Sequence, residues 1–592
     1  MNIISRYRET RWLFGDKLKY YIFLFFLAVL SAVLDLLGIG IIYPVFSAII
    51  GLGDNAGQDF PKLVRPVLEY FNNFDLKELA ILISSIFIIK NITKFGVDYG
   101  GIKITNLIRA DWMSKLYNKY IYSNYKLFYT KDHGELLNNL WSVTMQAIEC
   151  YRQLVRFMMF LILFILTAFT MLLISFKVTS VVGITLFFIY LLINRPIAKK
   201  GIILGTKKIT SHEDVQTIPN DSFKGIREIK TYSIEDKILN QYKNAVDRMV
   251  TLRNNIAFFQ YLPQMFPEIL GILFFSIALI FISNSPSVSI KVLFPIIITY
   301  TYAALKLLGS ASGLVKAYMI FNTNKPSVTK LKKELLTKSY LDVLQGNQNV
   351  QSEGEYLEVS DVSFSYSKSE SVFQNLNIKF KKGNFYAIVG DSGAGKSTLA
   401  DLILKIYDIQ SGGILYDNKN INDFSLNQWR GQIGIVSQDT FLFKDSIINN
   451  IRIVNSQIND ESIITAAKRA NAHDFIITKK NGYDTFVGER GVKLSGGQRQ
   501  RISLTRALTG NPKILILDEA TSQLDQASEA ILMKEIESLK KNIILIVIAH
   551  RLSTVINADK IYVLKDGKIC ENGKHNELME LKGEYFKLYE RK

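Results

Sequence analysis

Long apolar stretches recur through the first 340 residues of the chain, whereas the rest alternates between short apolar runs and polar turns. A helix needs about 20 predominantly apolar residues to cross a bilayer. Six windows approach or exceed that length, namely Tyr20–Leu52, Leu79–Gly100, Phe157–Phe176, Val178–Ile193, Ile256–Ser283 and Val292–Leu308. The pattern predicts an α-helical membrane domain with six transmembrane helices and both ends on one side.

The basic residues of this region predict its orientation. They cluster ahead of the first window and in the long loops after the second and fourth windows, while the other loops hold few. Because Lys and Arg accumulate in cytoplasmic loops, we expect both termini and both long loops to lie on the cytoplasmic side of a cell's inner membrane. Residues 1–340 hold 39 Lys and Arg against 22 Asp and Glu, and the remainder holds 32 against 31. This orientation therefore accounts for the net charge of +18.

Composition narrows the class of protein. Apolar residues make up 48% of the chain and charged residues 21%, which excludes a disordered chain and a nucleic-acid-binding tail protein. The two cysteines, Cys150 and Cys570, cannot build a disulfide framework, and no Cys/His spacing is typical of a zinc site. We expect the bilayer, and no nucleic acid, among the partners.

Both long cytoplasmic loops continue the helical pattern beyond the membrane. No proline occurs between Leu79 and Tyr125, and a helix of that length reaches roughly 70 Å at 1.5 Å per residue. Apolar residues also continue at helical spacing through the segment 195–255. We expect such helices to carry motion between a cytosolic domain and the membrane.

Four charged residues fall inside the predicted spans, namely Asp35, Lys90, Glu268 and Lys306. A charge at the bilayer centre costs at least ~2.5 kcal/mol, so such residues pair with one another or face a cavity. One interpretation pairs Asp35 with Lys90 and Glu268 with Lys306. The alternative has both lysines facing a cavity, where they attract an anionic head group.

The second half of the chain contains a phosphate-binding pattern. The short apolar run Phe385–Val389 precedes a match to G-x-x-x-x-G-K-[ST] that comprises Gly390, Asp391, Ser392, Gly393, Ala394, Gly395, Lys396, Ser397 and Thr398. The glycines let backbone N–H groups close around phosphate oxygens, Lys396 reaches the β- and γ-phosphates, and Ser397 ligates Mg²⁺. This strand–loop–helix pattern predicts an α/β nucleotide-binding domain that uses ATP and Mg²⁺.

Two further apolar runs end in candidate catalytic residues. Ile514–Leu517 is followed by Asp518 and Glu519, and Ile543–Ile548 is followed by Ala549 and His550. Residues at the carboxyl ends of parallel strands face the ligand crevice. Asp518 suits the metal's water shell, Glu519 suits a general base for the attacking water, and His550 is placed to contact the γ-phosphate.

These motifs resemble those of ABC ATPases. Leu494 is followed by Ser495, Gly496, Gly497 and Gln498, which look like the family's signature motif. Tyr366 resembles the aromatic residue that stacks on adenine, Gln438 the glutamine that also contacts the metal, His550 the switch histidine, and Ser522–Asp525 the D-loop. The resemblance covers the whole chain, because six spans ahead of one such ATPase is the layout of an exporter half-transporter. It implies a transmembrane domain over 1–335, a linker over 336–354 and an ATP-binding domain over 355–592.

The resemblance also implies a dimer. In the family, the loop Gly390–Thr398 of one subunit faces Ser495–Gln498 of the other across a bound ATP, with Asp525 beside it. The partner is a second copy or a paralogous half-transporter. The loop tips near Phe128–Glu135 and Ser222–Ile229 resemble the helices that dock on the ATPase beside Gln438. A gated channel or ATP-sensing regulator would be expected to lack the base or the signature, and this chain has both.

The sequence is compatible with several classes of transported substrate. Asp35, Gly38, Gly40 and Pro44 in the first window are similar to flippases of lipid-linked oligosaccharides and to polysaccharide exporters. That similarity favours an amphipathic, lipid-linked glycan or related glycolipid as substrate. A peptide or antimicrobial exporter, or a lipid or multidrug exporter, is the alternative.

Overall fold

The computed structural model describes residues 18–50, 70, 74–174, 176–283, 290–337, 346–350, 354–367, 370–520, 526–549 and 551–590. The chain divides into two compact units. A helical unit comprises Met1–Tyr122 and Leu127–Lys338, and an α/β unit comprises Ser123–Lys126 and Ser339–Lys592. The division falls inside the predicted 336–354 linker, part of which lies outside the described residues.

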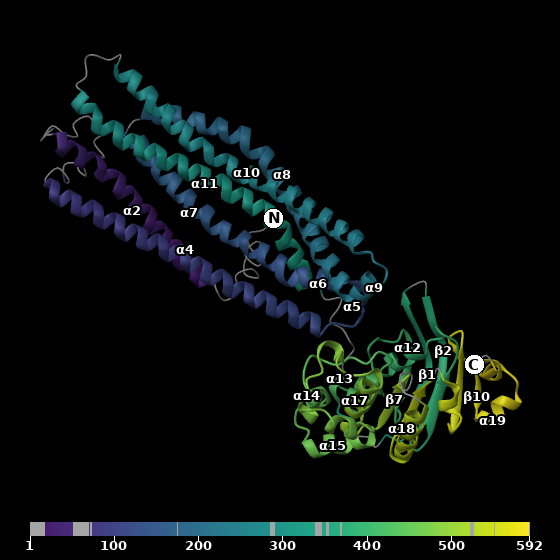
Figure 1. Ribbon diagram of the computed structural model, residues 1–592. Coiled ribbons are helices and arrows are strands. Elements are labelled where there is room, and N and C mark those ends of the chain that lie inside the picture. Colours follow the sequence, from purple (N-terminus) through teal and green to yellow (C-terminus); the bar gives the residue numbers. More distant parts are fainter. Residues whose placement is uncertain are drawn as a thin grey trace. The chain divides into compact units, whose positions relative to one another are not determined.

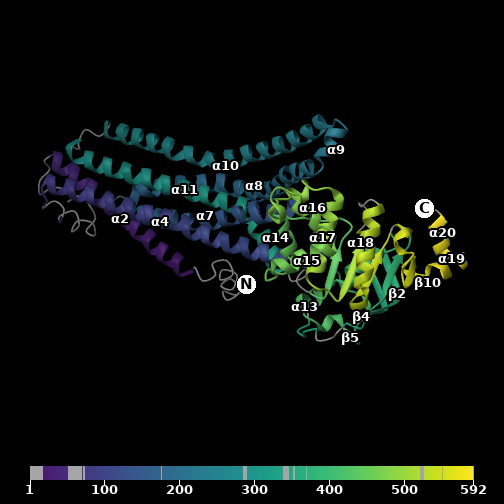
Figure 2. The same cartoon turned by 60° about the horizontal axis from the view of Figure 1, so that its bottom comes forward.

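The helical unit is a bundle of long helices that run side by side (Figures 1 and 2). They are α2 (Leu18–Ile50), α4 (Leu76–Ile121), α7 (Thr144–Ile174), α8 (Phe176–Lys224), α10 (Glu235–Ser283) and α11 (Ile290–Leu336). α11 packs against α7, α10, α8 and α2, and α2 packs against α4. α11 thus lies at the centre of the packing.

Four helices in the described part of the chain are long and apolar enough to cross a membrane. They cover Lys19–Ile50, Leu76–Ile121, His133–Leu172 and Ile297–Leu336. The windows Val178–Ile193 and Ile256–Ser283 fall in α8 and α10, but many of their side chains lie outside the described residues. The count of six spans therefore stays a prediction. α4 has 46 residues, about 69 Å at 1.5 Å per residue, which confirms the predicted extension beyond a bilayer.

Short helices form at the tips of the two predicted cytoplasmic loops. They are α5 (Lys126–Thr130), α6 (His133–Asn138) and α9 (Ile226–Thr231), and a π-helical turn at Asn139–Val143 joins α6 to α7. Their predicted docking beside Gln438 stays a prediction.

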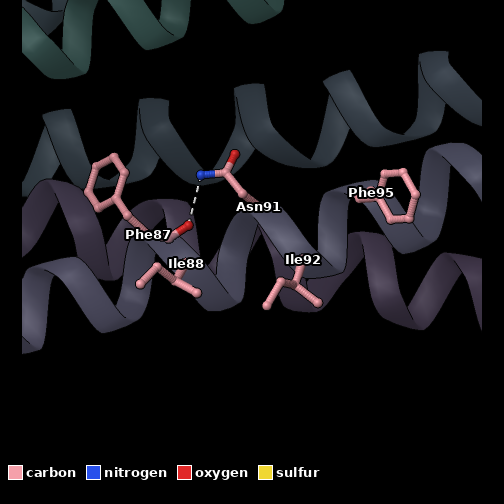
Figure 3. A pocket seen from close by; sticks show the side chains of 5 residues that line it. All are labelled: Phe87, Ile88, Asn91, Ile92 and Phe95. Carbon is pink, nitrogen blue, oxygen red and sulfur yellow. Dashed lines mark hydrogen bonds between the residues drawn. The ribbon is translucent and has the colours of Figure 1, made fainter.

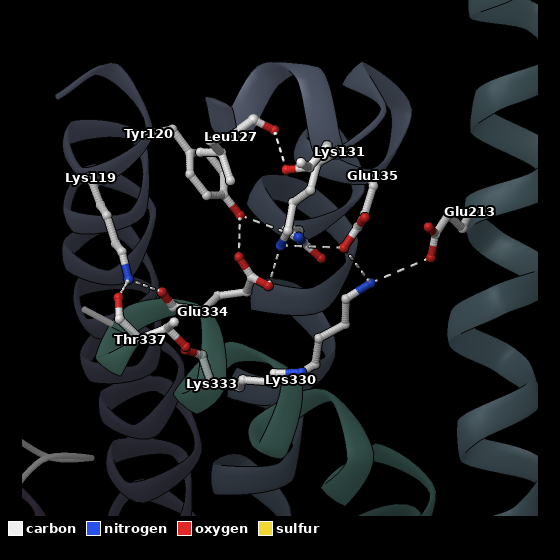
Figure 4. A network of polar contacts seen from close by, with 12 residues as sticks. Lys119, Tyr120, Leu127, Lys131, Glu135, Glu213, Lys330, Lys333, Glu334 and Thr337 are labelled. Atoms are coloured by element: carbon white, nitrogen blue, oxygen red, sulfur yellow. Dashed lines mark hydrogen bonds and ion pairs between the residues drawn. The ribbon is translucent and has the colours of Figure 1, made fainter. Parts of the chain in front are cut away.

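A polar network ties the last turns of α11 to the first loop (Figure 4). The Lys131 ammonium lies 2.5 Å from Glu334 and 3.5 Å from Glu135, and Lys330 lies 3.5 Å from Glu135 and 3.4 Å from Glu213. The Tyr120 hydroxyl donates a hydrogen bond to Glu334 at 3.2 Å. Several helices that are distant in sequence therefore converge on the carboxyl-terminal end of α11.

One ion cluster lies within the predicted spans. Asp35 Oδ1 is 2.6 Å from the Lys90 ammonium and 3.1 Å from the Lys306 ammonium. The predicted pairing of Asp35 with Lys90 is confirmed. Lys306 of α11 also contacts Asp35 of α2. Its predicted pairing with Glu268 stays a prediction, because the Glu268 side chain lies outside the described residues. A single carboxylate therefore holds two lysines.

The α/β unit contains two sheets. The six-stranded sheet has the order β10-β9-β3-β8-β7-β6, in which β9 to β6 are parallel and β10 pairs antiparallel with β9. Its strands are β3 (Phe385–Val389), β6 (Ile433–Val436), β7 (Ile514–Asp518), β8 (Ile544–Ile548), β9 (Lys560–Lys565) and β10 (Lys568–Gly573). The four-stranded antiparallel sheet, in the order β2-β1-β4-β5, contains β1 (Tyr356–Ser367), β2 (Glu370–Lys381), β4 (Ser411–Tyr416) and β5 (Lys419–Asn420).

Both faces of the parallel sheet are buried, as continuous apolar strands require. Phe385 and Ala387 belong to one apolar core, whereas Tyr386 and Ile388 belong to the other. The surrounding helices are α12 (Lys396–Ile403), α13 (Leu426–Arg430), α14 (Ile447–Arg452), α15 (Asp460–Arg469), α16 (His473–Ile477), α17 (Gly496–Thr509), α18 (Gln526–Leu539), α19 (His575–Glu580) and α20 (Glu584–Glu590). The predicted membrane domain with an α/β nucleotide-binding domain is confirmed as the fold class.

Candidate functional site: a phosphate loop and its catalytic edge

The loop between β3 and α12 has a backbone that requires glycine. Gly393 and Gly395 adopt φ values of 83° and 99°, a region that L residues rarely populate. A Cβ at Gly395 would lie 2.8 Å from the Phe373 ring, and one at Gly390 would collide with the carbonyl of Leu564. The loop therefore lies close against its neighbours and leads directly into α12, whose N-terminal N–H groups favour an anion.

Lys396 lies at the centre of this loop. Its side chain is buried, and its ammonium donates hydrogen bonds to the carbonyl oxygens of Gly390 at 2.9 Å and Asp391 at 2.8 Å. These contacts hold the positive charge within the loop rather than in solvent. The role of Lys396 as a counter-charge for phosphate stays a prediction.

Strand register brings the predicted acids to the edge of the sheet where the loop begins. Ile548 of β8 lies opposite Ile388 of β3 on one side and opposite Asp518 of β7 on the other. Since these strands are parallel, their carboxyl ends meet at one edge. Gly390, Asp518 and Glu519 therefore share the edge, as the sequence predicts.

Gln438 and Glu519 are in direct contact at this edge. The Gln438 amide donates a hydrogen bond of 2.8 Å to the Glu519 carboxylate. Glu519 has a left-handed backbone with φ of 52°, which costs about 1 to 3 kcal/mol and persists only where surrounding structure imposes it. Its N–H bonds to the carbonyl of Ile548 at 3.0 Å. The backbone thus fixes the carboxylate beside the glutamine.

The metal candidates have suitable chemistry. The Ser397 hydroxyl and the Asp518 carboxylate are hard oxygen donors of the kind that Mg²⁺ prefers, and this ion usually takes only one or two protein ligands together with phosphates and water. Asp518 is buried at the end of β7. Burial, with a contribution from Asp518, raises the pKa of Asp401 in α12 to about 6. These residues fit a Mg²⁺ that is bound together with a nucleotide.

Tyr366 lies near the start of α12. Its hydroxyl is 2.9 Å from the Thr398 hydroxyl, and its ring makes edge contacts with the rings of Phe364 and Tyr407. The aromatic residue and the phosphate loop are therefore brought together, as expected for a base-stacking residue.

The predicted signature forms the N-terminal end of α17. Ser495 caps this helix, and its side chain and that of Gln498 each bond to the other's backbone N–H at 3.3 Å. Gly496 and Gly497 form the first turn. Ser495 is exposed, so a 14-residue helix presents its positive N-terminal end at the surface of one chain.

Sequence reasoning missed Arg506, a partly buried anchor further along α17. Its guanidinium donates to the carbonyl of Asn450 at 2.8 Å and to that of Phe441 at 3.1 Å. Burial lowers the pKa of Arg506. Arg506 thus links α17 to the segment that follows Gln438. The sequence signal for such a role is the position of Arg506 in an arginine-bearing helix.

Two predicted site residues, Asp525 and His550, lie outside the described residues. The neighbouring Arg551 forms an ion pair of 3.0 Å with the buried Glu529 of α18. This contact anchors the chain directly after the predicted switch histidine.

Comparisons with known proteins agree with this architecture. Residues 21–334 match the family model described as ABC transporter transmembrane region, and residues 373–522 match the one described as ABC transporter. Relatives from Staphylococcus aureus, provisionally named multidrug export ATP-binding/permease proteins, are 48% identical in strain NCTC 8325 / PS 47 and 47% in strain bovine RF122 / ET3-1. Each match covers 245 residues, which is 41% of this chain and 42% of the relative.

A solved structure resembles nearly the whole chain. The structure of a bacterial Atm1-family ABC exporter with ATP bound has a TM-score of 0.75 and 23% sequence identity, and the match covers 96% of this chain and 97% of that one. This likeness concerns the fold. The family model that matches more than half of the sequence shows that the chain belongs to the ABC transporter family, and its fold is that of the exporter structure.

Proposed function

We propose that this chain is one half of an ATP-driven exporter, which binds MgATP, hydrolyses it and uses the cycle to move a substrate outward. The observation that carries this proposal is the contact between Gln438 and Glu519 at the sheet edge that also bears the phosphate loop. In this proposal the Glu519 carboxylate is the general base, which lies beside the γ-phosphate of a bound ATP and activates the attacking water.

The remaining residues have complementary roles in the proposal. Residues 390–398 cradle the phosphates, and Lys396 neutralises their charge. Ser397 and Asp518 hold Mg²⁺, partly through water and with Gln438 beside it; the ion neutralises charge on the transferring phosphate. Tyr366 stacks on the adenine. His550 contacts the γ-phosphate, a role that rests on its motif alone.

We propose that two chains form the working transporter. Ser495, at the exposed start of α17, supplies N–H groups to an anion that faces it. One chain's Ser495–Gln498 and Asp525 then complete the phosphate loop of the other. A homodimer and a pairing with a paralogous half-transporter both satisfy this requirement. The predicted orientation places the ATP-binding domains in the cytoplasm and the helices in the inner membrane.

A multidrug substrate now has more support as the cargo than a glycolipid has. The Staphylococcus aureus relatives carry multidrug export in their names, whereas a lipid-linked glycan rests on the short similarity at Asp35, Gly38 and Pro44. We therefore propose an amphipathic substrate of the kind that multidrug exporters accept. A lipid-linked oligosaccharide is the second candidate.

The test is stimulation of ATP hydrolysis by substrate in phosphatidylcholine liposomes. Hydrophobic dyes, peptides and a lipid-linked oligosaccharide are added to the purified protein, and phosphate release is followed. We expect the dyes to stimulate ATP hydrolysis by the wild type. Lys396→Ala should lose all hydrolysis, and Lys419→Ala on the exposed β5 is the matched control. A wild-type protein without ATPase activity would contradict the proposal, and stimulation by the oligosaccharide alone would restore the glycolipid.

A further inference from the structure

In the ion cluster of Asp35, Lys90 and Lys306, two lysines share one carboxylate. Both ammonium nitrogens contact the same oxygen, Asp35 Oδ1, at 2.6 and 3.1 Å. They therefore lie within about 6 Å of each other, a distance at which like charges repel strongly in a weakly polar medium. Among the residues that the structure describes, Asp35 is the carboxylate that forms ion pairs with these two lysines, so two ammonium groups share one carboxylate.

The cluster lies at one depth in the predicted membrane. Each charged residue is about 21 to 24 Å along its helix from the end predicted to face outward, at 1.5 Å per residue. This depth is inside the hydrocarbon layer, which is about 30 Å thick. Charged side chains at this depth are costly, and such residues mark substrate pathways.

The three charged residues differ in exposure. The side chains of Lys90 and Asp35 are 9% and 11% exposed, whereas that of Lys306 is 28% exposed. The Lys90–Asp35 pair is thus the buried part of the cluster. Lys306 is the more exposed of the two cations, and the Tyr302 ring centroid lies 5.6 Å from its ammonium.

An apolar groove adjoins the cluster on α4 (Figure 3). It has a volume of about 460 Å³ and is lined by Phe87, Ile88, Asn91, Ile92 and Phe95. The Phe87 ring connects the groove to the cluster, because its centroid is 4.9 Å from the Lys90 ammonium. A Cβ on Gly38 of α2 would lie 3.1 Å from the same ring, so Phe87 packs closely against α2. A cation beside an apolar groove suits a molecule with an anionic head and a hydrocarbon tail.

We propose that Asp35, Lys90 and Lys306 form a head-group subsite for the exported substrate, and that this substrate is an anionic amphiphile. The inference rests on the proposed export function and narrows its substrate class. Lys306 contacts the anionic group, Asp35 holds both lysines at the site, and the tail lies along the α4 groove.

The test measures binding without ATP to the full-length protein in phosphatidylcholine nanodiscs. Three fluorescent probes share a dodecyl tail and end in a phosphate, an uncharged glucose or a quaternary ammonium. We expect Lys306→Gln to weaken binding of the phosphate probe at least tenfold and to change binding of the glucose probe less than twofold. Lys306→Arg should keep the phosphate probe bound, and Asp35→Asn should tighten it, because the net charge of the site rises.

Lys94→Gln is the matched control, since it removes the same charge from an exposed position one turn along α4 from Lys90. It should bind all three probes as the wild type does. Equal loss of the phosphate and glucose probes in Lys306→Gln, or no loss of either, would overturn the proposal. Nucleotide binding by each variant verifies its fold, and Lys306→Arg keeps the test decisive if Asp35→Asn does not fold.

Two further arms identify the source of the anion. Competition by phosphatidylglycerol in the nanodisc assigns the subsite to bilayer lipid, and competition by millimolar inorganic phosphate assigns it to a soluble anion. Competition by phosphatidylglycerol supports an anionic amphiphile as the occupant, whereas equally strong competition by inorganic phosphate contradicts it. ATP-driven transport is scored separately, so its absence would refute the export function while the selectivity of binding still decides the subsite.

Discussion

The side-chain amide of Gln438 donates a hydrogen bond of 2.8 Å to the carboxylate of Glu519. The two residues follow the neighbouring parallel strands β6 and β7 and are 81 positions apart in the chain. Movement of the segment that carries Gln438 therefore changes the surroundings of the proposed base directly. This contact is the structural basis on which we expect ATP hydrolysis to respond to the membrane domain.

Replacement of the base should separate binding from hydrolysis. Glu519→Gln keeps the size and hydrogen-bonding capacity of the side chain but cannot accept a proton from water. We expect turnover to fall by about two to four orders of magnitude, with nucleotide affinity changed less than threefold. Phosphate release and titration with a fluorescent ATP analogue measure the two quantities. Glu535→Gln, on the exposed side of α18, is the control, and near-normal turnover in Glu519→Gln would remove the residue from its proposed role.

Complementation should reveal the proposed dimer. Ser495→Arg places a bulky cation at the N-terminal end of α17 and should abolish hydrolysis although the phosphate loop of the same chain is intact. Lys396→Ala should abolish it through loss of the phosphate counter-charge. If each site uses both chains, mixing the two variants restores at most one working site per dimer. Activity of a monomer in detergent at the wild-type level would refute the two-chain arrangement.

The network at the end of α11 should contribute to the stability of the helical unit. Glu334→Gln leaves the largely buried Lys131 ammonium with Glu135 at 3.5 Å as its remaining ion-pair partner. We expect a loss of about 1 to 3 kcal/mol, measured as a lower Tm of the full-length protein. Glu228→Gln on the exposed surface of α9 controls for charge. The double variant Lys131→Gln with Glu334→Gln should recover part of the loss, and a fully additive loss would argue against direct pairing.

Asp401 predicts a pH dependence of stability in the α/β unit. Its pKa is raised to about 6 by burial and by Asp518, whereas an unfolded Asp titrates near 3.9. A carboxyl with a raised pKa stabilises the folded state in its protonated form, so the stabilisation present below pH ~4 is lost as the pH rises through about 6. Asp401→Asn should therefore raise Tm relative to the wild type at pH 8 and lose this advantage at pH 4. An advantage that is independent of pH would contradict the assignment.

Local patterns predict the nucleotide site well. The apolar run Phe385–Val389 coincides with β3, and the loop that follows it is fixed by glycines that few other residues could replace. Such features depend on neighbours in sequence, so they can be read without the tertiary structure. The shared edge of Gly390 and Asp518 was also predictable, because parallel strands present their carboxyl ends together.

Contacts between distant segments could not be predicted in the same way. The spans pair Lys306 with Glu268, and they do not reveal that α11 also packs against α2, which brings Lys306 to Asp35. The anchoring of Arg506 to Asn450 likewise depends on how α14 packs against α17. A sequence gives the cost of a buried charge, but the helix packing decides which partner compensates it.

ATP-dependent transport in proteoliposomes tests the central claim most directly. The protein is reconstituted into phosphatidylcholine vesicles in the inside-out orientation, and MgATP is added outside. Accumulation of the fluorescent dodecyl phosphate in the lumen or inner leaflet is followed over time. We predict accumulation by the wild type that stops with Glu519→Gln and continues with Glu535→Gln. Accumulation by Glu519→Gln at the wild-type rate would contradict an ATP-driven exporter. The same conclusion would follow if the wild-type protein hydrolysed ATP but accumulated none of the probes tested.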